Sequence, residues 1–140
     1  MSDVVTSSRL THEGALKVIG AAIEKANEMG VPQCVAVTDA SGRLLAFVRM
    51  DGAKFLSIRT SIRKAMTAAS ARVPSGGADM DHAMKLAFTT GGRLTHLKAG
   101  VPIVVDGEVL GAVGVSSGAG EQDLEVALAG VAAIPRAKEW

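Results

Sequence analysis

The residue types that could do chemistry gather around a glycine-rich stretch near the C-terminal end of the chain. Residues 116–120 (SSGAG) separate an apolar strand-like run from an apolar helical run that begins at Glu121. Backbone N–H groups at such a strand-to-helix bend can bind an anion, which makes Gly118 and Gly120 candidate ligand-binding residues. The stretch is neither a dinucleotide fingerprint nor a P-loop, because Asp123 replaces the third glycine and no Walker lysine follows. A tight turn with acidic residues at a helix N-terminus is the competing interpretation.

Charged residues elsewhere in the chain could complete a site at this bend. Arg49 and Asp51 close an apolar strand, so they form either a solvated strand end or a site at which Arg49 meets a carboxylate of a ligand or of Glu121. Lys64 lies in a helical run with other basic residues, which is typical of a solvated face. If Lys64 faced a cleft instead, it could bind a carboxylate or, together with Glu121, transfer protons.

The sequence does not predict a metal site built from several side chains. His12, His82 and His96 are far apart, and none belongs to an H-x-x-x-H pair. A single histidine is enough to ligate haem iron, and His12 is kept as the candidate haem ligand. Cys34 is the only cysteine, which excludes an internal disulfide, and its place in an apolar strand predicts a core residue.

Length and composition predict one globular domain spanning residues 1–140. Apolar residues make up 48% of the chain, the net charge is +1, and aromatic residues make up 3%. A nearly neutral chain with few aromatic side chains does not fit a nucleic-acid-binding protein. No apolar run reaches the roughly 18 residues of a membrane span, and the first eight residues do not read as a signal peptide, so we expect a cytoplasmic protein.

Hydrophobic periodicity predicts the elements that must position these residues. Asp106-Gly107 fits a type I′ hairpin turn, and Gly111 and Gly114 inside the following strand suggest a bulge or a close backbone approach. The predicted class is α+β, with α/β/α layers around a mainly antiparallel five-stranded sheet. The expected helices are 11–29, 57–72, 79–88 and 121–133, and the expected strands are 34–38, 44–50, 94–98, 101–105 and 109–115.

Three blocks of the sequence carry a family resemblance. They are LTHEGALKVIGAAIEKANEMGVPQCVAVTDASGRLLAFVRMDGA, the helix containing Ser57, Ile58 and Lys64-Ala65, and GVPIVVDGEVLGAVGVSSGAGEQD. In this order and spacing they resemble the GlcG/HbpS family, also called the haem-degrading or DUF336 domain, which is similar to the C-terminal domain of PduO-type proteins. The resemblance runs from Leu10 to Ile134 and marks residues 10–134 as the core of the domain.

This resemblance implies a profilin-like fold that assembles into homo-oligomers, from dimers to octamers. It also implies haem as a candidate cofactor, because some members bind haem or its breakdown products, whereas others sit in catabolic operons without an assigned activity. The matching pocket positions are Arg49, Asp51, Lys64, Gly118, Gly120 and Glu121. The least family-like part is the insert 74–98, which we expect to shape the pocket.

These observations leave three hypotheses. The first is a small oligomeric ligand-binding protein that holds haem or another planar or carboxylate-bearing metabolite between the second helix and the Gly118–Gly120 bend. The second is a cofactor-independent isomerase, tautomerase or lyase of small-molecule catabolism, in which Lys64 and Glu121 move protons. The third is an accessory protein that binds a neighbouring enzyme through an exposed apolar patch.

Overall fold

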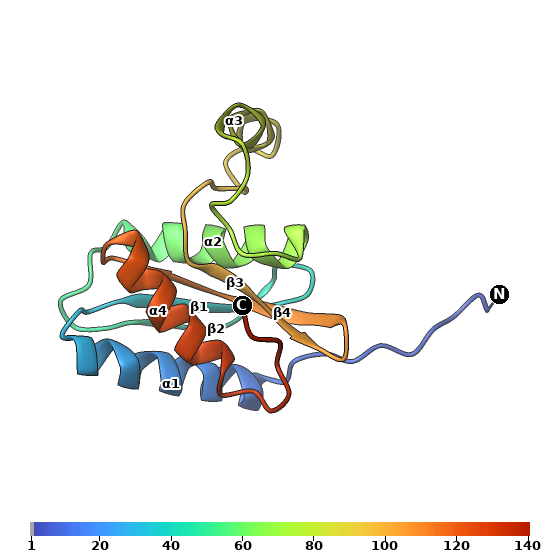
Figure 1. Ribbon diagram of the computed structural model, residues 1–140, viewed down its shortest axis with the longest axis horizontal. Helices are drawn as coiled ribbons and strands as arrows, with labels where there is room; N and C mark the ends of the chain where they lie inside the picture. The colour runs from blue at the N-terminus through green and yellow to red at the C-terminus, as the bar shows by residue number, and fades with distance from the viewer. Residues whose placement is uncertain (1) are drawn as a thin grey trace.

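A computed structural model describes residues 2–140 as four helices and one four-stranded antiparallel sheet (Figure 1). The strands lie in the order β2-β1-β4-β3, and none of the helices within residues 2–140 is long and apolar enough to cross a membrane. The elements are α1 (His12–Met29), β1 (Cys34–Asp39), β2 (Leu44–Arg49), α2 (Ser57–Ala71), α3 (Met80–Thr89), β3 (Gly100–Val105), β4 (Glu108–Ser116) and α4 (Gly120–Val131).

Local sequence signals set several of these boundaries. Thr11 caps α1, because its side-chain oxygen accepts the backbone N–H of Gly14 at 3.0 Å. Gly30 ends the helix with φ +69°, a left-handed conformation that glycine adopts without steric cost. Asp106 and Gly107 both have positive φ, which confirms the predicted type I′ turn between β3 and β4.

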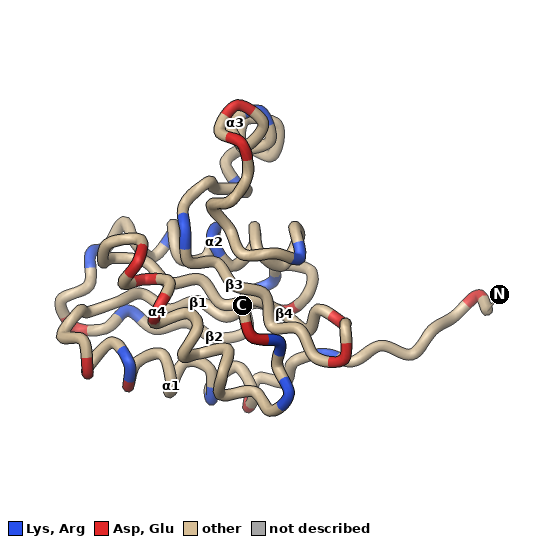
Figure 2. Tube along the Cα trace, viewed as in Figure 1, with Lys and Arg blue, Asp and Glu red and all other residues tan. Residues whose placement is uncertain are grey.

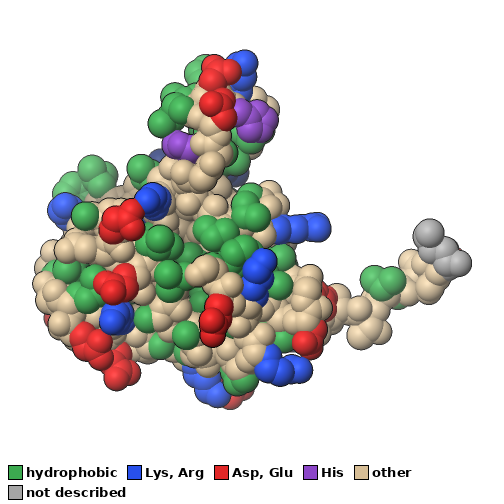
Figure 3. All heavy atoms as spheres, viewed as in Figure 1, with side chains coloured by type: hydrophobic (Ala, Val, Ile, Leu, Met, Phe, Trp, Pro, Cys, Tyr) green, Lys and Arg blue, Asp and Glu red, His purple; other side chains and the backbone are tan. Residues whose placement is uncertain are grey.

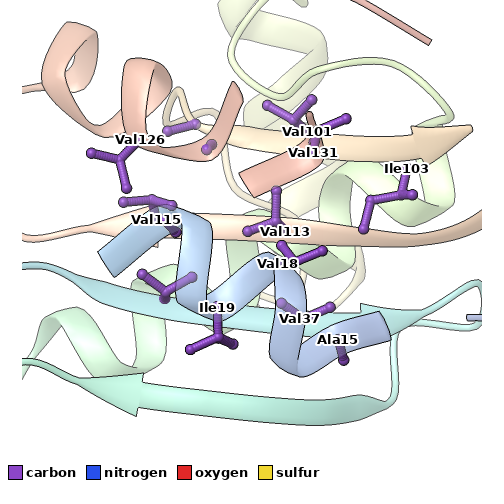
Figure 4. Packing of buried hydrophobic residues seen from close by; sticks show 14 of the residues in the cluster. Ala15, Val18, Ile19, Val37, Val101, Ile103, Val113, Val115, Val126 and Val131 are labelled. Carbon is purple, nitrogen blue, oxygen red and sulfur yellow. The ribbon is translucent and has the colours of Figure 1, made fainter. Parts of the chain in front are cut away.

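The two faces of the sheet carry side chains of different size. Helices α1 and α4 cover one face and α2 covers the other (Figure 1). Valines and isoleucines fill the layer under α1 and α4, including Val37, Val113 and Val115 (Figure 4). The α2 side holds mainly small residues, and its buried apolar cluster consists of Ala65, Ala68, Ala69 and Ala112. Strand alternation separates the two sets, because neighbouring residues of a strand point to opposite faces.

A pair of glycines lets α2 lie directly on the sheet. Gly100 of β3 and Gly114 of β4 are register partners on adjacent strands. A Cβ atom at Gly114 would lie 2.0 Å from the Ser61 carbonyl oxygen, and one at Gly100 would lie 2.0 Å from the Lys64 carbonyl oxygen. Gly114 therefore marks a close backbone approach, as the sequence suggested for a glycine inside a strand.

The predicted fifth strand is wrong: the sheet has four strands, and residues 94–98 form an irregular segment. This segment bonds to side chains rather than to a neighbouring strand. The Thr95 N–H donates to Thr67 Oγ1 at 2.9 Å, and Ser75 Oγ donates to the Leu97 carbonyl at 2.7 Å. These side-chain partners satisfy the backbone groups that a sheet ladder would otherwise use.

The predicted short helix exists as α3, which stands away from the layered body on two connecting segments (Figure 1). Its buried residue is Ala83, whereas Met80, Met84 and Phe88 are 57%, 59% and 92% exposed. These three residues, spaced four apart, form one apolar stripe along the helix. Figure 3 shows green hydrophobic side chains at the surface of the arm.

The C-terminal tail covers part of the β3 edge. Ala137 forms an isolated antiparallel bridge with Val105, and the Lys138 N–H donates to the Val104 carbonyl at 2.7 Å. Trp140 Nε1 donates to the Pro102 carbonyl at 2.9 Å, so this tryptophan packs on the strand. The tail thereby pairs backbone groups of an edge strand that would otherwise be open to other chains.

We expect Gly114→Ala to lower the free energy of unfolding by about 1–3 kcal/mol or more, because the new methyl group must push α2 off the sheet. Gly20→Ala is the matched control, since Gly20 lies within α1 and its Cβ would meet nothing within 4 Å. That change should raise stability by about 0.5–1 kcal/mol. Urea unfolding of the two variants measures both effects, and equal effects would contradict the close contact.

Candidate functional site

A buried ion pair joins α2 to the first turn of α4. Lys64 Nζ lies 3.1 Å from Asp123 Oδ2 and donates to the Val115 carbonyl at 2.7 Å. Both side chains are almost fully buried, with 4% and 3% of their surface exposed. Burial lowers the pKa of the Lys64 ammonium from its ordinary value, and the adjacent Asp123 carboxylate opposes that shift. The arrangement locks the end of β4 to the helix that follows it.

Side chains from the first turn of α4 accept hydrogen bonds from the backbone N–H groups of the glycine bend. The Gly118 N–H donates to Asp123 Oδ1 and the Ala119 N–H donates to Gln122 Oε1, each at 2.9 Å. The amide of Gly118, which the sequence suggested for an anion, and the neighbouring amide of Ala119 therefore already have acceptors. Gln33 is fully buried beside the bend, since its Nε2 would lie 3.0 Å from a Cβ at Gly118. Its amide has no hydrogen-bond partner among the described residues, so the bend covers a polar group.

Glu121 forms a second, exposed ion pair with Lys98. The pair joins the segment that leads into β3 to the first turn of α4, where basic and acidic parts of the trace approach each other (Figure 2). Its side chains are 51% and 77% exposed for Lys98 and Glu121. Lys64 and Glu121 thus have different partners in the structure. Proton transfer by these two residues requires a shared cavity and stays a prediction.

Arg49 and Asp51 lie at the end of β2 and in the turn that follows, and both are exposed. The structure brings this turn to the glycine bend, because the Lys54 N–H donates to Ser117 Oγ at 3.0 Å. Arg49 also lies near Cys34, whose thiol pKa is raised by burial and lowered in part by that guanidinium. Cys34 itself is fully buried, as predicted for a core residue.

A cavity of about 640 Å³ lies between α2, α3 and the segments that connect α3 to the body. Its walls are mainly aliphatic and include Val73, Leu86 and Leu94. Volume and lining fit a small-molecule site, since such sites are usually apolar concavities of about 300–1,000 Å³. Gly118 and Gly120 are not among its lining residues, but Lys98 and Leu124 extend the wall toward the start of α4. The polar lining residues are Thr67, Ser75, His82, Thr95, His96 and Lys98.

Two of the histidines line this cavity. His82 lies on α3 and His96 on the returning segment, and Figure 3 shows histidine side chains on the arm and at its base. His96 Nδ1 is buried and has no hydrogen-bond partner among residues 2–140. His12 is the exposed first residue of α1 and does not line this cavity. Within the described residues, no group of three or more His, Cys, Asp or Glu side chains could hold a metal ion.

Sequence reasoning did not single out Lys98, and it treated His96 only as one of three isolated histidines. Both residues fall in the insert 74–98, which was expected to shape the pocket and does line the cavity. Gly76 could have served as a signal: its φ is +92°, and a Cβ there would lie 3.1 Å from the Lys98 Cα. A glycine at this contact allows the two connecting segments of the arm to pack together.

Comparisons with known proteins agree on one family. A family model described as "Haem degrading protein HbpS-like" matches residues 10–132. Protein GlcG of Escherichia coli (strain K12) is 41% identical over 108 residues, which cover 76% of this chain and 81% of GlcG. The crystal structure of Klebsiella pneumoniae protein ORFY has a TM-score of 0.87 at 28% identity and covers 95% of each chain. A structure titled "PduOC:Heme Complex" has a TM-score of 0.83 at 26% identity, covering 95% of this chain and 100% of that chain.

We expect Lys64→Met to lower the free energy of unfolding by about 3–5 kcal/mol, because it leaves the Asp123 carboxylate buried without its partner charge. Lys85→Met is the control, since it breaks an exposed pair with Asp81 whose side chains are 74% and 77% exposed. That change should cost less than about 1 kcal/mol. Combining Lys64→Met with Asp123→Asn should cost less than the sum of the two single changes. Equal losses for Lys64→Met and Lys85→Met would exclude a buried charge pair.

Proposed function

Because the chain belongs to the HbpS-like family, we propose that it binds haem or another flat, largely apolar small molecule bearing a carboxylate. We place the ligand in the cavity between α2, α3 and the connecting segments of the arm. The haem complex of a protein with 26% identity and a TM-score of 0.83 supports this ligand class. The cavity lies beside α2, and Lys98 connects it to Gly120: a Cβ at Gly120 would lie 3.7 Å from Lys98 Cβ. The proposed site is thus displaced from the Gly118–Gly120 bend toward α3.

The observation that carries the proposal is the position of His96 in the wall of the cavity. His96 lines an apolar cavity of about 640 Å³ with a half-buried ring. Its Nδ1 is buried, so a ligand in the cavity would meet the accessible part of the imidazole. An imidazole nitrogen is a usual axial ligand of haem iron, so the residues present fit this group. His82, which lines the same cavity from α3, is the second candidate ligand.

The chain's own residues have separable roles in this proposal. Haem, when bound, would supply an iron centre able to change redox state. His96 would hold and orient the bound molecule, and the aliphatic walls would exclude water from its apolar face. Lys98 would attract its carboxylate at the rim, near the first turn of α4. Arg49, Asp51, Gly118 and Gly120 would act at the adjoining bend, which the Lys54–Ser117 hydrogen bond connects to the turn after β2.

A haemin titration followed by absorbance tests the proposal. We expect one saturable Soret shift per chain for the natural protein and its loss or wavelength change in His96→Ala. His12→Ala is the control, because His12 is exposed at the start of α1 and does not line the cavity. Loss of the shift in His12→Ala alone would move the site to α1. Absence of any saturable shift in the natural protein would reject haem as the ligand.

We also propose that the chain forms a homo-oligomer through the apolar stripe of α3. Met80, Met84 and Phe88 expose a continuous apolar face on an arm that the rest of the chain leaves uncovered, and a second copy supplies apolar surface of the same kind. Large exposed apolar patches commonly mark protein–protein contacts.

Light scattering coupled to size exclusion tests this contact. Phe88→Glu should reduce the measured mass, because it places a charge within the proposed apolar contact. Lys85→Glu is the control, since it changes charge on the same helix but outside the stripe and next to its partner Asp81. A monomeric natural protein, or an unchanged mass for Phe88→Glu, would contradict the proposed interface.

A further inference from the structure

Among the described residues that line the cavity, Lys98 is the one lysine or arginine, and no aspartate or glutamate is present. The remaining lining residues are aliphatic side chains, glycines, hydroxyl side chains and the two histidines. A single cation in an otherwise apolar lining favours a ligand with an apolar body and one acidic end. The position of Lys98 thus favours one orientation of the ligand, in which its acidic group lies at the side of the cavity that faces the start of α4.

The stem of Lys98 runs past two glycines, Gly76 and Gly120. A Cβ at Gly76 would lie 3.0 Å from Lys98 Cγ, and a Cβ at Gly120 would lie 3.7 Å from Lys98 Cδ. The stem therefore passes between the connecting segment of the arm and the N-terminus of α4.

The ammonium of Lys98 already has an acidic partner in its own chain, Glu121. The two side chains are 51% and 77% exposed, and an ion pair at this exposure contributes little stability because water screens it. A ligand carboxylate can therefore take the place of Glu121. The ammonium has three N–H donors, yet two carboxylates at one cation repel each other, so Glu121 weakens the binding of an acid.

We propose that Lys98 selects ligands bearing a carboxylate and that Glu121 is an internal competitor that sets their affinity. This inference rests on the proposed function, because it assigns the substrate class and a specificity-determining pair to the same cavity. The inference concerns the carboxylate of the ligand and not the iron of haem, so it applies to metal-free ligands as well. The Lys98–Glu121 pair is then an exchangeable contact, in contrast to the buried Lys64–Asp123 pair.

The test compares metal-free mesoporphyrin, which carries carboxylates, with its dimethyl ester, using fluorescence titration of the purified protein. Lys98→Met should weaken mesoporphyrin binding about tenfold, as expected for loss of a charge-assisted contact. Glu121→Gln should strengthen it by about two- to fivefold, because Lys98 is freed and a repelling charge is removed. Neither change should alter binding of the dimethyl ester.

Asp106→Asn is the control for net charge, because it removes one carboxylate from another exposed pair, with Arg136. It should leave both affinities unchanged. If Lys98→Met and Glu121→Gln affect acid and ester equally, or affect neither, the carboxylate-selecting role is overturned while the binding function stands. If neither porphyrin binds the natural protein, the proposed function and this inference fail together.

Discussion

The contact between α2 and the sheet is the constraint on which the other features depend. It exists because Gly100 and Gly114 lie side by side on β3 and β4, where any side chain would collide with carbonyl oxygens of α2. Close approach brings Lys64 within reach of the Val115 carbonyl and of Asp123 beyond the end of β4. Burial at this depth removes water from the ammonium, so a partner charge is required there.

The contact between α2 and the sheet also affects the proposed ligand site, through the Lys64–Asp123 pair and the start of α4. Asp123 pairs with Lys64 and also accepts the Gly118 N–H, which fixes the bend and the starting direction of α4. That direction places Glu121 opposite Lys98 at the rim of the cavity. Ser75 ties the arm to the sheet, since its hydroxyl donates to the Leu97 carbonyl and accepts the Gly100 N–H. One of the two ion pairs at the start of α4 is therefore buried, and the other is exposed to solvent.

Most of the secondary structure was predictable because its signals are local. Thr11, Gly30 and Asp106-Gly107 act through the backbone conformations and caps of their own segments, and the structure confirms all three. The predicted strand 94–98 failed because apolar alternation says nothing about a pairing partner. In the fold, the side chains of Thr67 and Ser75 form hydrogen bonds with backbone groups of this segment.

The sequence by itself predicted the helices, both hairpins and the family resemblance, and it left a bulge or a close backbone approach open at Gly114. Only the tertiary structure decided that Lys64 pairs with a carboxylate 59 residues away and that Lys98 and His96 line one cavity. The physical reason is the sequence distance over which each kind of interaction acts. Propensity, capping and turn geometry act over a few residues, whereas the partner and burial of a charged side chain depend on how distant elements pack. Lys64, predicted to be solvated or to face a cleft, became a buried charge only once α2 lay on two glycines.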